Sequence, residues 1–170
     1  LFAFTAVLWL LLTTLLGLFL IWNFTSNIFP KDSVHYLSLH AHVGIIGWFL
    51  LMIIGVGSRL IPMFLISKYE NEKQLWWVYS LINAGLISFI FLFVSSVKLA
   101  LYFIPVVLIG LGAILFGNHI YQAFVNRIRK KVDGQVKISM LSVVFILVPL
   151  IVLSIIIAVL TTVKSTQPAL

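Results

Sequence analysis

The sequence predicts an all-α fold, a polytopic bundle of transmembrane helices with five spans. Apolar residues make up 62% of its 170 residues and charged residues only 9%, whereas soluble domains carry about 25% charged residues. Five apolar stretches are long enough to cross about 30 Å of hydrocarbon, which takes about 20 helical residues. No strand-length alternation of polar and apolar residues occurs, so the spans are helices rather than a barrel.

The predicted spans cover residues 1–22, 36–66, 75–97, 99–125 and 138–163 and form a single transmembrane domain. The first lacks a basic leader region and a small-residue cleavage site, so it is not a secretory signal. Because the chain opens in the middle of an apolar run, it is typical of a piece of something longer.

The second span is longer than one crossing requires. Arg59 and Pro62 mark its predicted inner boundary, with residues 60–66 lying along the interface. Asp32 and Ser33, just ahead of it, are good helix-capping residues.

Aromatic residues and prolines mark the remaining spans. The third begins at the pair Trp76 and Trp77, as expected of an aromatic belt at the membrane surface. The fourth and fifth contain Pro105 and Pro149, where we expect kinks.

Basic residues predict the orientation of the spans. Of the 11 Lys and Arg residues, eight fall on one side: Arg59, Lys68, Lys73, Arg127, Arg129, Lys130, Lys131 and Lys137. Lys31, Lys98 and Lys164 fall on the other. The positive side is cytoplasmic, so the N-terminus is expected inside and the C-terminus outside.

The net charge of +7 follows from these basic loops facing an anionic leaflet of the lipid bilayer, and we expect no nucleic-acid partner. The chain has no cysteine, which excludes disulfides, thiolate metal sites and thiol catalysis.

The densest polar signal lies between His40 and Trp48 at the outer end of the second span. At 100° per residue, Gly44, Gly47 and Gly55 fall within about 60° of the direction of His40. A histidine above a row of glycines leaves a flat wall, the surface that a planar macrocycle needs if an imidazole is to reach its iron. The alternative is that the glycines permit close helix packing and the histidines face the wet interface. Spacing alone leaves both open.

The run His40-Ala-His42, followed by Gly55-Val-Gly57-Ser-Arg-Leu-Ile-Pro62, resembles the second helix of haem-copper oxidase subunit I. It also resembles the related nitric-oxide reductase large subunits and divergent bacterial proteins of this kind. The resemblance covers residues 34–67 and implies that His40 is an axial ligand of a haem b near the outer face. In the related subunits, the spacing from the ligand histidine to the proline falls between the spacing from His40 to Pro62 and that from His42 to Pro62. His42 is therefore the alternative ligand.

The resemblance also implies a role in electron transfer or a respiratory complex in the bacterial cytoplasmic (inner) membrane. The expected partners are an electron donor on the outer side and other membrane subunits, or the remainder of a longer chain. The family's oxygen-reducing centre needs more histidines than the four present, so this chain alone is not an oxidase, and no catalytic residue is assigned. The alternative function is a non-redox accessory or transporter-like subunit.

His119 lies near the cytoplasmic end of the fourth span, roughly 20 Å in depth from His40, so the two cannot clamp one iron. We expect it to join Arg59 and Asn83 in a polar cluster and to hydrogen-bond to a neighbouring helix; a hydrated path or a second haem are the alternatives. Glu70 and Glu72 are expected to lie in a solvated loop.

Overall fold

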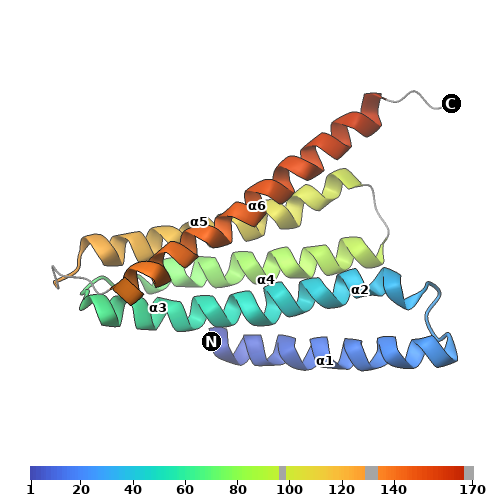
Figure 1. The fold of residues 1–170 in the computed structure, drawn as a ribbon, viewed down its shortest axis with the longest axis horizontal. Coiled ribbons are helices and arrows are strands. Elements are labelled where there is room, and N and C mark those ends of the chain that lie inside the picture. Colours follow the sequence, from blue (N-terminus) through green and yellow to red (C-terminus); the bar gives the residue numbers. More distant parts are fainter. Residues whose placement is uncertain (96–98, 129–133, 167–170) are drawn as a thin grey trace. The chain divides into compact units, whose positions relative to one another are not determined.

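The computed structural model describes residues 1–95, 99–128 and 134–166, and it confirms the all-α class. The elements are α1 (Phe2–Ser26), α2 (Ser33–His42), the π-helical segment η1 (Val43–Leu50), α3 (Leu51–Leu65), α4 (Glu72–Val94), the 3-10 turn η2 (Leu99–Tyr102), α5 (Phe103–Val125) and α6 (Gly134–Thr166) (Figure 1). The predicted loop residues Lys98, Arg129, Lys130 and Lys131 lie outside the described residues.

Within the described residues, four helices are long and apolar enough to cross a membrane: Phe2–Ser26, Ser33–Leu65, Glu72–Val94 and Ala100–Val125. Their large apolar side chains are widely exposed; Phe4 is 69% and Phe91 68% exposed. Such continuous apolar surface needs lipid rather than water, and the chain is therefore a multi-pass membrane protein. The predicted fifth span falls within α6, whose part Gly134–Phe145 is a shorter apolar helix.

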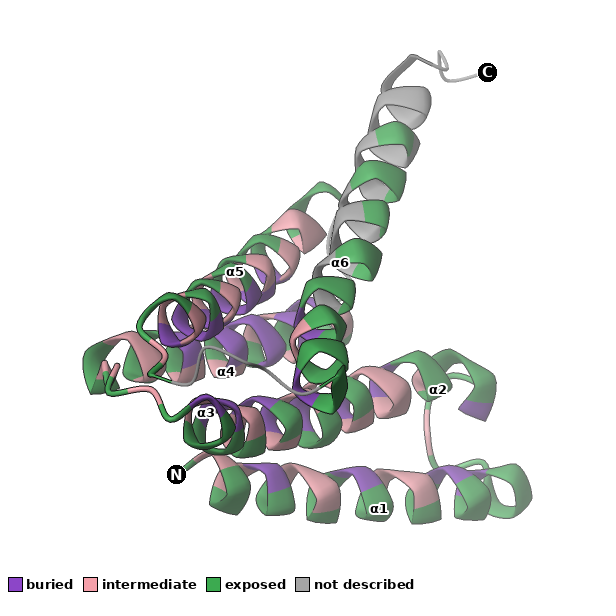
Figure 2. Cartoon of the chain, turned by 60° about the vertical axis from the view of Figure 1, so that its left-hand side comes forward, coloured by how far each residue is buried: buried purple, intermediate pink, exposed green. Residues whose placement is uncertain are grey.

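The chain forms two compact units, residues Leu1–Gly57 and Ser58–Leu170, and each is described by itself. In the first unit α1 packs against α2 and η1 as an antiparallel hairpin (Figure 1). The buried residues of α1 follow one edge of the helix, and its opposite face is exposed (Figure 2). They recur at a spacing that keeps a narrow stripe on one side: Ala6, Thr13, Leu20 and Asn23.

Side-chain hydrogen bonds close the turn between α1 and α2. Asn27 ends α1 in the left-handed conformation, with φ of 46°. The Asn23 amide donates to Ser33 Oγ at 2.9 Å and accepts from the backbone N–H of Phe29 at 2.7 Å. Ser33 in turn donates to the carbonyl of Leu20 at 3.2 Å. Asp32 is the N-cap residue of α2 as predicted, but its side chain makes no capping bond.

In the second unit α4 and α5 form another antiparallel hairpin, and α6 contacts α5. A Cβ at Gly85 would lie 2.6 Å from Ile109 Cγ1, and a Cβ at Gly112 would lie 2.8 Å from Ile82 Cγ1. Each helix therefore seats an isoleucine of its neighbour on a glycine, the small-residue packing expected between helices in lipid.

Pro62 lies inside α3, which ends at Leu65, one residue before the predicted end of the second span. One expectation about a proline needs correction. Pro105 lies in the first turn of α5, where a missing N–H removes no intrahelical bond, so its position gives no reason to expect a kink. Pro149 does lie inside a helix, α6.

Candidate functional site

His40 lies near the end of α2 with its ring against α1. A Cβ at Gly17 would come within 3.1 Å of His40 Cε1 and 3.6 Å of Nδ1, so the absence of a side chain at Gly17 makes room for the imidazole. The residue is half-buried, and Nδ1 is buried without a hydrogen-bond partner among the described residues. A buried nitrogen in this state costs about 1–3 kcal/mol, so packing alone does not explain a histidine here.

His42, two residues on, has a different environment. Its Nδ1 lies 2.7 Å from the carbonyl oxygen of Ser38, one turn earlier on the same helix. Because a carbonyl only accepts, Nδ1 donates in this bond, and in a neutral imidazole Nε2 then holds the lone pair. This is the tautomer that histidine ligands of metals adopt when a backbone carbonyl orients them.

The glycines expected to form an open wall below His40 lie against α1 instead. A Cβ at Gly44 would lie 3.1 Å from Thr13 Cγ2, and a Cβ at Gly55 would lie 2.6 Å from Phe2 Cβ. Gly47 is buried. Within this chain, the space beside Gly44 and Gly55 serves close helix packing, which was the alternative interpretation of the same pattern.

The π-helical segment explains part of this difference. It begins directly after His42 and contains Gly44 and Gly47. A π-helix closes its hydrogen bonds over five residues rather than four, so the turn per residue is smaller than the 100° used to place the glycines beneath His40. π-helical turns occur frequently beside functional residues, which makes the neighbouring His40 and His42 candidates for a site.

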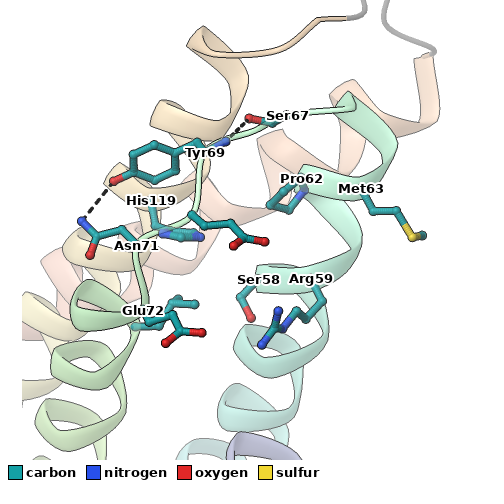
Figure 3. A pocket seen from close by; sticks show the side chains of 11 residues that line it. Ser58, Arg59, Pro62, Met63, Ser67, Tyr69, Asn71, Glu72 and His119 are labelled. Atoms are coloured by element: carbon teal, nitrogen blue, oxygen red, sulfur yellow. Dashed lines mark hydrogen bonds between the residues drawn. The ribbon is translucent and has the colours of Figure 1, made fainter.

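A second polar site lies in the other unit, where α3 ends, α4 begins and α5 ends. A pocket of about 190 Å³ is lined there by Ser58, Arg59, Pro62, Met63, Ser67, Tyr69, Glu70, Asn71, Glu72, Leu75 and His119. Figure 3 shows the guanidinium of Arg59 and the carboxylate of Glu72 directed toward one another across it. Glu70 and Glu72 are exposed as predicted, but they belong to this pocket rather than to a loop that is only solvated.

His119 occupies a core position of α5. It is 2% exposed and falls on the buried stripe that otherwise carries apolar or small residues: Pro105, Ile109, Gly112, Ala113, Phe116, Ile120 and Ala123. Its ring packs 5.3 Å from that of Tyr69, between centroids. Its Nδ1 is buried without a hydrogen-bond partner in the part of the chain that the structure describes.

The expected hydrogen bond from His119 to a neighbouring helix is therefore wrong within the described residues, because the ring faces an aromatic ring and a pocket. The predicted cluster is correct in part, since Arg59 and His119 line one pocket. Asn83 does not line it; its amide donates to the carbonyl of Tyr79 at 2.9 Å.

Hydrogen bonds hold the loop that forms one wall of the pocket. Asn71 caps α4 by accepting from the N–H of Gln74 at 3.0 Å, and Tyr69 donates to Gln74 Oε1 at 3.0 Å. Gln74 Nε2 then donates to the carbonyl of Leu115 on α5 at 2.9 Å. The loop is thereby tied to α5 one turn before His119.

The start of the loop, directly after α3, is tied to the residues that follow α5. The N–H of Ile128 donates to the carbonyl of Ile66 at 3.2 Å, beside an isolated bridge between Ser67 and Arg127. The pocket wall is therefore attached to α5 at one end and to the segment after α5 at the other.

Sequence reasoning did not identify several residues of these sites. Gly17 and Thr13 were missed because nothing local shows which residues of α1 face the second helix. Tyr69 and Asn71 were missed because their neighbours in the pocket are distant in sequence. An Asn two residues after a Tyr and directly before a helix was a usable capping signal, but it indicates a helix start rather than a site.

These features define a multi-pass helical membrane protein with one histidine-bearing hairpin and one polar pocket. Among the described residues, no group of three or more His, Asp or Glu side chains is arranged to hold a metal ion. Protein-family models, curated proteins and solved structures contain no match to this chain.

Proposed function

We propose that the hairpin of α1, α2 and η1 supplies an axial imidazole to a b-type haem, as part of a haem-copper oxidase subunit I-like protein in electron transfer or a respiratory complex. His40 is the first candidate ligand. The observation that carries the proposal is the half-buried imidazole of His40, seated on Gly17 with an unpartnered Nδ1. A polar ring kept at such a cost in a spanning helix is a functional hypothesis by default.

Haem b would supply one-electron transfer, and imidazole is its ordinary protein ligand. The ring edge with Cε1 and Nδ1 faces Gly17, so a ligand bond would use Nε2, the nitrogen farther from that seat. The opposite ligand would come from another membrane subunit or from further chain, and the electron donor from the outer side.

His42 is the second candidate ligand, and one observation favours it. Its hydrogen bond to the Ser38 carbonyl fixes the tautomer in which Nε2 can bind a metal, whereas His40 lacks such a partner. The two residues differ in direction, so a single haem would use only one of them.

A non-redox accessory or transporter-like subunit is the competing function. It is favoured by the contacts that α1 makes at Gly44 and Gly55, which need no cofactor to explain the glycines. The two functions differ in whether the purified protein carries a haem.

Replacing His40 and His42 separately by Leu in the native membrane complex tests the proposal through reduced-minus-oxidised spectra. We expect His40→Leu to abolish the b-type α band and His42→Leu to retain it. The opposite pattern would assign the ligand to His42. A full b-type signal in both variants would sink the haem assignment and leave the accessory role.

We further propose that the protein lies in a bacterial inner membrane with its N-terminus inside. Lys31 and Lys73 are both exposed; Lys31 lies between α1 and α2, and Lys73 lies in the first turn of α4. Because the chain has no cysteine, single Lys31→Cys and Lys73→Cys variants report topology directly. An impermeant thiol reagent applied to intact cells should label the first and spare the second; the reverse would invert the orientation.

A further inference from the structure

The pocket of the second unit holds opposite charges that do not neutralise one another. Arg59 and the carboxylates of Glu70 and Glu72 line it, yet no ion pair within 4.0 Å joins them in the described part of the chain. These glutamates are two of only four acidic residues in the protein. Figure 3 shows Arg59 and Glu72 facing each other across the space.

His119 is an independent sign of a ligand at the same place. It lines the pocket, is 98% buried and makes no hydrogen bond to any described residue. A buried polar group left without a partner usually has water, an ion or a ligand beside it. The pocket therefore combines a cation, two carboxylates and an imidazole that has no hydrogen-bond partner among the described residues.

The pocket lies at the level where the spans meet the membrane surface. The span of the second helix ends at Leu65 and the next begins at Glu72. Trp76 and Trp77, both exposed, follow within the first turns of α4, as expected at the height of lipid headgroups. A ligand in this pocket would therefore come within reach of the headgroup layer.

We propose that this pocket binds the headgroup of phosphatidylethanolamine, with its ammonium on Glu70 and Glu72 and its phosphate on Arg59. Such a headgroup carries both charges at once, so it satisfies the separated groups together. Phosphatidylglycerol has no cation for the carboxylates. The quaternary ammonium of phosphatidylcholine cannot donate hydrogen bonds, whereas a primary ammonium has three N–H donors.

Charge-assisted hydrogen bonds give this choice its strength. The ammonium and the phosphate would each pair with an ionised side chain, and such bonds are about twice as strong as neutral ones. His119 and Asn71 add neutral hydrogen-bonding groups to the pocket.

The test uses the intact protein, purified from its membrane and placed in phosphatidylcholine nanodiscs that contain graded phosphatidylethanolamine. Native mass spectrometry then measures which lipid stays bound. We expect about a tenfold preference for phosphatidylethanolamine over phosphatidylcholine, corresponding to roughly 1.4 kcal/mol. The double variant Glu70→Gln with Glu72→Gln should bring the preference close to one. Asp32→Asn, which removes an acidic group outside the pocket, should leave it unchanged.

If the double variant fails to fold, the single variant Glu72→Gln takes its place. It should lower the preference for phosphatidylethanolamine over phosphatidylcholine severalfold. His119→Gln should also lower retention while leaving any haem spectrum unchanged, which separates this site from the proposed haem site. Equal retention of the two lipids, or an unchanged preference in Glu72→Gln, would overturn the proposal.

Two further measurements identify the source and the charge of the ligand. Soluble phosphoethanolamine should displace the lipid only at concentrations far above those of the lipid itself. Displacement at equal concentration would assign the pocket to a soluble amine phosphate. Tighter retention of phosphatidylglycerol than of phosphatidylethanolamine would show that the pocket is merely a basic surface. This result, or displacement by soluble phosphoethanolamine at equal concentration, would reject the phosphatidylethanolamine site.

Discussion

In both helical hairpins a side chain of one helix packs against a glycine of the other, but the two hairpins place different kinds of side chain there. In the hairpin of α4 and α5, the side chains seated on Gly112 and Gly85 are Ile82 and Ile109, both apolar. In the hairpin of α1 with α2 and η1, the seat at Gly17 holds the imidazole of His40.

An isoleucine on a glycine maximises dispersion contacts and leaves no polar atom unsatisfied. The imidazole of His40 against Gly17 leaves a buried nitrogen with no partner among the described residues. The comparison indicates that the glycine contacts of the α4–α5 hairpin serve packing alone, whereas the contact at Gly17 in the first hairpin sacrifices stability. Such a sacrifice is typical of functional positions.

The largest change in stability is expected in the hairpin of α4 and α5. Gly85→Ala and Gly112→Ala should each destabilise the protein by about 1–3 kcal/mol, because the added Cβ overlaps a seated isoleucine. Gly85 should be the more sensitive, since its Cβ would also lie 3.2 Å from the backbone carbonyl of Pro105.

Unfolding of the purified protein in detergent would measure these changes. Gly110→Ala is the matched control for Gly112→Ala on α5, because beyond its chain neighbours and its own helix backbone a Cβ there would meet no described atom within 4 Å. It should be neutral or stabilising by up to about 1 kcal/mol. If Gly112→Ala proved as stable as this control, the α4–α5 contact would be wrong.

The next expected effect is a gain in stability rather than a loss. His40→Leu should stabilise the haem-free protein by about 1–2 kcal/mol, because it replaces an unsatisfied buried nitrogen with an apolar group. His42→Leu should not, because it removes a hydrogen bond to the Ser38 carbonyl. Thermal unfolding of haem-free preparations provides the comparison. Destabilisation by His40→Leu would mean that the imidazole contributes to packing as the isoleucines do.

A smaller effect is expected from Gly17→Ala. The added Cβ would lie 3.1 Å from His40 Cε1, so the ring must shift by a few tenths of an ångström, at a cost below about 1 kcal/mol. If His40 binds haem, this shift should also alter the low-temperature electron paramagnetic resonance spectrum of the haem. Gly44→Ala, which meets Thr13 Cγ2 at the same distance, is the control for stability.

The smallest effect is expected at Thr13. Its methyl group faces Gly44, while its hydroxyl donates to the carbonyl of Trp9 on its own helix at 2.7 Å. Thr13→Val keeps the methyl contact and removes a bond that competes with the helix, so stability should change by less than about 0.5 kcal/mol. A larger loss in the same unfolding assay would show that this hydroxyl contributes to the first hairpin.

The spans and the helical class were predictable from the sequence, because hydropathy is a local and additive property of a continuous segment. Four predicted spans therefore coincide with apolar helices to within a few residues at most ends. The largest difference is at the end of α1, which runs on to Ser26, four residues beyond the predicted span. There, capping and backbone hydrogen bonds decide the boundary, and hydropathy does not report them.

The sequence indicated which residues were candidates, but it did not indicate which residues they contact. An ionisable side chain in an apolar run is visible in the sequence, and this was enough to single out His40, His42 and His119. Only the tertiary structure decided that His40 sits on Gly17 and that His119 shares a pocket with Glu70. Those contacts depend on the rotation and register of one helix against another. Rotation and register are set by how side chains interlock across the pair, and a π-helical segment changes them without any local change in hydropathy.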